Sequence, residues 1–261
     1  MESLIPVGME LADVVVLAAA AFLTSILSAV VGMAGGVTLL SVMLLNLEPL
    51  VAIPLHGAVQ LVSNGSRAWI QRAHVRWSIV GRYAALLLPA GFVGYYTIAE
   101  LMSPTAMKAV IGCFVLVATW RPSLLLLGSH PEDADPNRRF LVLGFIAGLL
   151  NVAIGATGPL IAPFFLNLGL SRFALIGTKA ICQTFGHLSK IVIFAVTGFA
   201  FAAHLPLLLM LWAMVVAGTW TGSQLLHRVD ELLFTRLYKG VLSLIALRLI
   251  FAAAESVLKT G

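Results

Sequence analysis

The residues best suited to chemistry are polar side chains that recur at helical spacing inside two otherwise apolar stretches. In residues 50–71 the spacing is i, i+4, i+7, i+8 and i+11, which places them on one face of a helix. This face carries His56, Gln60, Ser63, Asn64 and Arg67. One face of residues 172–200 carries Lys179, Gln183, His187 and Lys190, with Thr178, Thr184 and Ser189 beside it. Neither face contains an acidic residue, so the pattern predicts that a small bound anion supplies the counter-charge.

Two glycine-rich interruptions offer a second kind of anion-binding group. They read Gly32-Met33-Ala34-Gly35-Gly36 within residues 11–46 and Gly155-Ala156-Thr157-Gly158-Pro159 within residues 139–169. Glycine and proline weaken a helix, and broken backbone at membrane depth survives only where protein buries it or it lines a wet cavity. A helix that starts after such a break presents unpaired N–H groups and the positive end of its dipole. Such a helix end is a ready site for an anion.

We therefore predict a substrate site between the two breaks, facing the two polar helix faces. The predicted substrate-binding residues are Gly32, Gly35, Gly36, His56, Gln60, Asn64, Gly155, Thr157, Gly158, Thr178, Lys179, Gln183, His187 and Lys190.

The same polar residues also have structural interpretations. Arg67 can anchor the cytoplasmic end of its helix by extending its head group to the membrane surface. Gln60 and Gln183 can form hydrogen bonds between helices. The histidines can be satisfied core residues, the lysines can sit near the ends of tilted helices, and the glycines can serve packing alone.

The elements that must position these residues are membrane helices. Of the 261 residues, 60% are hydrophobic and 10% are charged, whereas a soluble domain has about 25% charged residues. The mean hydropathy is +1.02. The net charge of +5 does not indicate nucleic acid, because the basic residues cluster in short connections between apolar runs. The apolar segments that could enter or cross a bilayer are 11–46, 50–71, 77–99, 104–120, 139–169, 172–200, 205–226 and 232–256.

An internal repeat is visible when the sequence is compared with itself at an offset of 123 residues. Gly32 then aligns with Gly155, Gly35 with Gly158 and Gln60 with Gln183, and Arg67 falls opposite Lys190. We predict one membrane transport domain over residues 1–261, in which repeats 11–120 and 139–256 are joined by the polar linker 121–138.

The positive charges predict opposite orientations for the two repeats. The connection around residues 67–76 carries Arg67, Arg72 and Arg76 and should be cytoplasmic, while its counterpart, residues 198–204, has no Lys or Arg. Inverted repeats require an odd number of crossings in each half. Each half would then be a re-entrant, glycine-broken segment followed by three transmembrane helices, with both termini outside. The alternative is eight ordinary spans and parallel halves.

Enzyme, metal and cofactor functions find no support in the motifs. The chain has no His-Glu-x-x-His motif, no nucleophilic serine motif and no pair of acidic residues inside an apolar segment. The first glycine break lacks the Lys-Ser/Thr of a phosphate-binding loop. Cys113 and Cys182 lie inside apolar runs and read as small core residues. We expect an all-α membrane protein that is not an enzyme and uses no cofactor.

The chain resembles the TauE/SafE sulfite-exporter permeases. The resemblance rests on Val31-Gly32-Met33-Ala34-Gly35-Gly36, on the stretch from His56 to Arg67, and on Gly155-Ala156-Thr157-Gly158-Pro159 with Gly177-Thr178-Lys179. It extends over essentially the whole chain. It implies a multi-pass permease of the bacterial inner (plasma) membrane that exports sulfite, sulfoacetate or a related organosulfonate.

Together these observations predict a secondary transporter for a small anion, embedded in the lipid bilayer. No ATP-binding module is visible, so a gradient must supply the energy. His56 and His187 are candidates for proton coupling because histidine titrates near neutral pH, and plain uniport stays open. A homodimer also stays open. The alternative functions are an anion channel or a non-transporting membrane subunit.

Overall fold

The structure is a computed structural model that describes residues 10–31, 35–121, 123–124, 136–165, 168–225 and 231–260. All regular secondary structure in these residues is helical. The longer helices are α1 (Leu11–Val31), α2 (Gly35–Asn46), α3 (Pro49–Ile70), α4 (Trp77–Ala85), α5 (Leu87–Gly94), α6 (Pro104–Trp120), α7 (Pro136–Ile154), α9 (Arg172–Val196), α10 (Leu205–Leu225) and α11 (Glu231–Thr260). The short ones are η2 (Arg72–His74), η3 (Tyr95–Ala99), α8 (Gly158–Ile161), η5 (Ala162–Phe165) and η6 (Phe201–His204).

Several helix starts follow from local sequence. Pro49 and Pro104 occupy the first turns of α3 and α6, where a missing N–H costs nothing. Ser103 accepts a hydrogen bond from the Ala106 N–H at 3.2 Å, and Ser171 accepts one from the Ala174 N–H at 3.3 Å. Both serines therefore cap donors that the first helical turn leaves unpaired.

The glycine interruptions break the two long segments, as predicted. Segment 139–169 divides into α7, which ends at Ile154, and α8, which begins at Gly158. Gly155 adopts a left-handed φ of +78°, a conformation that side-chain-bearing residues disfavour. In segment 11–46, α1 ends at Val31 and α2 begins at Gly35. The residues between them, Gly32 among them, lie outside the described part of the chain.

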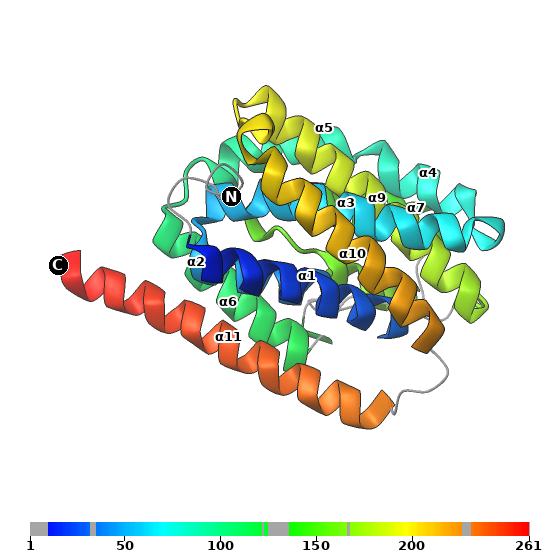
Figure 1. Cartoon of the computed structure of the whole chain (residues 1–261). Helices are drawn as coiled ribbons and strands as arrows, with labels where there is room; N and C mark the ends of the chain where they lie inside the picture. The colour runs from blue at the N-terminus through cyan, green and yellow to red at the C-terminus, as the bar shows by residue number, and fades with distance from the viewer. Residues whose placement is uncertain are drawn as a thin grey trace.

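The main helix pairings join the two halves of the chain. The central helices α3 and α9 pack against each other, α1 packs along α10, α5 and α4 pack along α7, and α6 packs along α11 (Figure 1). Each pairing takes one helix from residues 11–120 and one from residues 136–260. The halves are therefore intertwined, and elements from both can reach the centre.

Glycines let some of these helices approach closely. A Cβ on Gly218 of α10 would lie 2.3 Å from the Phe22 carbonyl oxygen of α1. A Cβ on Gly144 of α7 would lie 2.0 Å from the Tyr83 carbonyl oxygen of α4. Close backbone contact at small residues is a common way to pack helices where lipid removes the hydrophobic drive for association.

The outer surface is that of a multi-pass membrane protein. Among the described residues, three helical stretches are long and apolar enough to cross a membrane: Leu11–Val30, Trp77–Ala99 and Phe201–Leu225. Large apolar side chains face outward from many helices, for example Leu23, Val196, Leu209, Trp220 and Phe251. In water such a surface would cause aggregation, whereas in a bilayer it contacts lipid tails.

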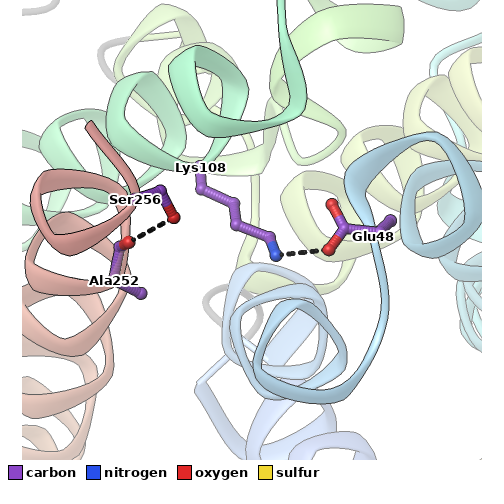
Figure 2. Close-up of polar contacts among 4 residues, drawn as sticks. All are labelled: Glu48, Lys108, Ala252 and Ser256. Carbon is purple, nitrogen blue, oxygen red and sulfur yellow. Dashed lines mark hydrogen bonds and ion pairs between the residues drawn. The ribbon is translucent and has the colours of Figure 1, made fainter. Parts of the chain in front are cut away.

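An ion pair lies away from the core. Lys108 of α6 meets Glu48, which precedes α3, with 2.9 Å between Nζ and Oε1. Figure 2 shows this pair near α11, where the Ser256 hydroxyl donates to the Ala252 carbonyl. The Glu48 side chain is 62% exposed. Among the residues with described burial, no acidic side chain is buried.

Candidate functional site

The glycine breaks and the two central helices enclose one small cavity. Its described lining comes from both halves: Ser28, Gly36, Val37, His56, Gln60, Arg67, Ala156, Thr157, Gly158, Pro159, Gln183 and His187. The cavity has a volume of about 20 Å³, which is room for one or two water molecules. The cavity therefore suits a ligand of a few atoms.

The start of α2 and the polar face of α3 form one wall. His56 Nε2 lies 2.8 Å from the Gly36 carbonyl oxygen, and since a carbonyl only accepts, this ring nitrogen carries the hydrogen. Asn64 Nδ2 donates to Gln60 Oε1 at 3.2 Å. With its oxygen engaged, the Gln60 amide has its Nε2 group left to donate to a ligand.

Thr157, α8 and the middle of α9 form the opposite wall. A Cβ on Gly158 would lie 2.9 Å from Gln183 Nε2, so the glycine leaves room for this amide beside the break. Likewise, a Cβ on Gly36 would lie 3.3 Å from Gln60 Oε1. One glutamine from each half thus lines the cavity, and each glutamine lies beside a glycine from the broken segment of the same half.

A histidine from each half meets at the cavity. The rings of His56 and His187 are T-shaped, with 5.6 Å between their centroids. Both rings are buried, and the Nδ1 atom of each has no hydrogen-bond partner among the described residues. A buried polar atom without a partner costs free energy, so these atoms are suited to meeting a ligand or water.

Arg67 is the cation that lines the cavity among the described residues. Its Nη1 donates to the Ser28 carbonyl of α1 at 3.0 Å, and its Nη2 donates to Asn64 Oδ1. Only 7% of the residue is exposed, which argues against the interpretation of Arg67 as a surface anchor. Sequence reasoning left it out of the site, although it shares the helical face of His56 and Gln60.

Seven predicted site residues line the cavity, namely Gly36, His56, Gln60, Thr157, Gly158, Gln183 and His187. Gly32 lies outside the described residues. The others are not part of its described lining: Gly35, Asn64, Gly155, Thr178, Lys179 and Lys190. Ser28, Val37, Ala156 and Pro159 line it without having been predicted.

The residues behind the lining have structural contacts of their own. Thr178 Oγ1 accepts a hydrogen bond from the Arg76 N–H at 3.0 Å and so caps the start of α4. A Cβ on Gly35 would lie 2.0 Å from the Thr24 carbonyl oxygen, so this glycine lets α2 fold back on α1.

The two buried lysines of α9 also lie outside the described lining. Lys190 Nζ donates to the Gly155 carbonyl at 2.6 Å. Lys179 is 2% exposed and close enough to Arg67 for the two charges to repel.

The electrostatic character of the centre is positive. Arg67, Lys179 and Lys190 are buried, and no acidic residue is buried among the residues with described burial. Desolvating a cation is costly without an opposite charge. An anion in the cavity would therefore stabilise the surrounding protein as well as be stabilised by it. The described residues contain no cluster of three His, Cys, Asp or Glu side chains that could hold a metal ion.

Comparison with known proteins gives one match. Residues 17–249 match the protein-family model described as Sulfite exporter TauE/SafE, a range that includes both halves and the linker. Neither the curated proteins nor the solved structures gave a match.

Proposed function

The chain belongs to the TauE/SafE family of sulfite exporters, and on this premise we propose that it exports a small sulfite-like oxyanion through the central cavity. The family makes it a membrane transport protein. The substrate, its binding site and the inner membrane as location are our proposals.

The observation that carries the proposal is the positive centre, with no buried acid among the residues whose burial is described. Arg67 reaches the cavity directly, while Lys179 and Lys190 add positive charge behind its walls. A neutral solute would add no negative charge beside these cations, and a second cation would be repelled by them. An anion is the ligand class that lowers the cost of burying them.

The donors around the cavity favour an oxyanion. The Gln60 and Gln183 amides approach from opposite halves, and Arg67 adds a guanidinium. A sulfite-like anion offers several oxygens in different directions, so it can accept from several of these groups at once. The small cavity favours an inorganic anion over an organosulfonate with a carbon chain.

The arrangement of the halves supports a carrier with inverted repeats. Equivalent elements of the two halves supply the walls, and α11 ends on the side of the molecule where α1 begins (Figure 1). In carriers of this plan the substrate sits where the repeats meet, and one repeat rocks against the other. We propose the same plan here, with both termini outside.

The test is sulfite efflux from proteoliposomes that contain the purified protein. We expect saturable efflux and counterflow, whereas an anion channel would give a flux that does not saturate.

Arg67→Gln should weaken sulfite binding by about 2–5 kcal/mol, the range for removing one partner of a buried charge pair. The matched control is Arg72→Gln, because Arg72 is exposed and the described contacts of its side chain, a hydrogen bond to the carbonyl and a cation–π contact with the ring, are both with nearby Trp69. Parent-like sulfite binding by the Arg67 variant would refute the proposed site.

Proton coupling is a second proposal about the same transport step. It rests on the contact between His56 and His187 and on the Nδ1 atom of each ring, which has no hydrogen-bond partner in the part of the chain that the structure describes. Lys190 and Arg67 are the charged groups near the pair. If an anion brings a proton with it, a pH gradient alone should drive sulfite movement, and His56→Gln with His187→Gln should abolish that response.

A further inference from the structure

Lys190 is fully buried but does not line the cavity. It lies on α9, it is 0% exposed, and its Nζ atom donates to the Gly155 carbonyl oxygen at 2.6 Å. Gly155 directly follows the last residue of α7. Carbonyls at the end of a helix lack partners within the helix and carry the negative end of its dipole. The ammonium group therefore has a counter-charge in the backbone and does not depend on the substrate for one.

The bond fixes the chain at the start of the cavity wall. Gly155 N–H donates to the Asn151 carbonyl at 3.1 Å, which closes α7, and the left-handed φ of Gly155 then turns the chain. The next residues, Ala156 to Pro159, line the cavity. A shift of the Gly155 carbonyl would therefore move Thr157 and Gly158 relative to Gln183.

The side chain of Lys190 reaches this carbonyl through a gap that α3 provides. A Cβ on Gly57 would lie 2.7 Å from Lys190 Cε. A Cβ on Gly155 itself would lie 2.8 Å from Leu40 Cδ2 of α2 and 3.0 Å from Ile53 Cγ1 of α3. The second glycine break is thus held in place by a lysine of its own half and by packing against the first half.

We propose that Lys190 is a positioning residue for the substrate site. It holds the Gly155 carbonyl so that Thr157 and Gly158 form the cavity wall, and it does not contact the anion. Arg67 has a related bond, to the Ser28 carbonyl of α1, but Arg67 also faces the cavity. The two central helices therefore use their cations differently.

The first experiment measures the position of the wall without any substrate. A thiol is introduced by Thr157→Cys in a Cys113→Ser background, which leaves only the buried native Cys182. Its reaction rate with a small, water-soluble thiol reagent is compared with and without Lys190→Met. We expect the rate to change severalfold. The control is Lys108→Met, which removes a lysine from the peripheral ion pair and should leave the rate unchanged.

The second experiment is a double-mutant cycle on sulfite transport. Lys190→Met and Gly57→Ala should each raise the KM for sulfite severalfold, because Gly57→Ala displaces the lysine without removing its charge. Since both act through the same bond, the double variant should be no worse than the more impaired single variant. Lys190→Arg should fail to restore the parent KM, because the larger guanidinium does not fit beside Gly57.

Three results would overturn the proposal: an unchanged thiol rate in Lys190→Met, single-variant effects on KM that multiply in the double variant, or full rescue by Lys190→Arg. The last would assign Lys190 to direct charge compensation of the anion. The proposal is independent of the substrate, because the thiol measurement is informative even if the parent protein proves not to transport sulfite. Size-exclusion profiles of every variant identify any that fail to fold.

Discussion

Among single residues, the buried cations Arg67 and Lys179 should differ in importance. Arg67 lines the cavity, whereas Lys179 lies behind its described lining. We predict that Lys179→Gln weakens anion binding less than Arg67→Gln does, because its charge acts across a greater distance. Titration calorimetry with sulfite on both variants checks the order. An equal or larger loss for Lys179→Gln would move the main charge of the site to α9.

Gly158 provides a test of the role of the Gln183 amide. We predict that Gly158→Ala leaves the fold intact but weakens anion binding, because the new methyl group must push Gln183 Nε2 away from its place beside the break. Gly81→Ala is the control, since no atom lies within 4 Å of a Cβ placed there. Thermal stability and sulfite affinity are measured on both. Parent-like affinity in Gly158→Ala would mean that the anion does not use Gln183.

Helical spacing in the sequence predicted much of the cavity but could not separate binding groups from supporting ones. His56, Gln60, Gln183 and His187 were expected on inward faces, and they line the cavity. Lys190 shares the face of His187, yet it bonds a backbone carbonyl. A polar face of a helix touches more than one neighbour. Which neighbour each side chain meets depends on tertiary packing, which the spacing does not contain.

Among the elements, the contact between α1 and α10 should control the amount of folded protein. Gly218 lies against the Phe22 carbonyl and Gly222 against Ile26, so larger side chains would force the helices apart. We predict that Gly218→Leu strongly lowers the yield of monodisperse protein in detergent. Gly240→Leu is the control, because no atom lies near a Cβ at that position of α11. A monodisperse, parent-like Gly218→Leu protein would contradict close packing.

The sequence located the helix breaks better than it located helix neighbours. Glycine and proline predicted the interruption after Ile154, and the structure confirms that α7 ends there. The pairing of α1 with α10 and of α5 with α7 was not predicted. These contacts join residues far apart in the chain, and apolar side chains of similar size give little information about their partners.

For the whole molecule, the orientation of the halves is the main open prediction. Ala73, in η2, and Ala202, in η6, are both exposed. In a Cys113→Ser background, a cysteine at Ala202 should react with an impermeant thiol reagent added outside intact cells. A cysteine at Ala73 should react only after the membrane is opened. Reaction of both cysteines from the same side would contradict the inverted arrangement.

The absence of buried carboxylates among the described residues has an electrical consequence. A substrate whose charge is matched by fixed arginine and lysine groups crosses the membrane with that charge. In a cell that is negative inside, the membrane potential then drives an anion outward with about 2.3 kcal/mol per unit charge for each 100 mV. For a divalent anion this amounts to a concentration ratio of about two thousandfold at 100 mV. A proton carried with the anion would cancel one unit of its charge and so reduce the electrical driving force. The membrane potential alone can therefore power export, without a coupled ion.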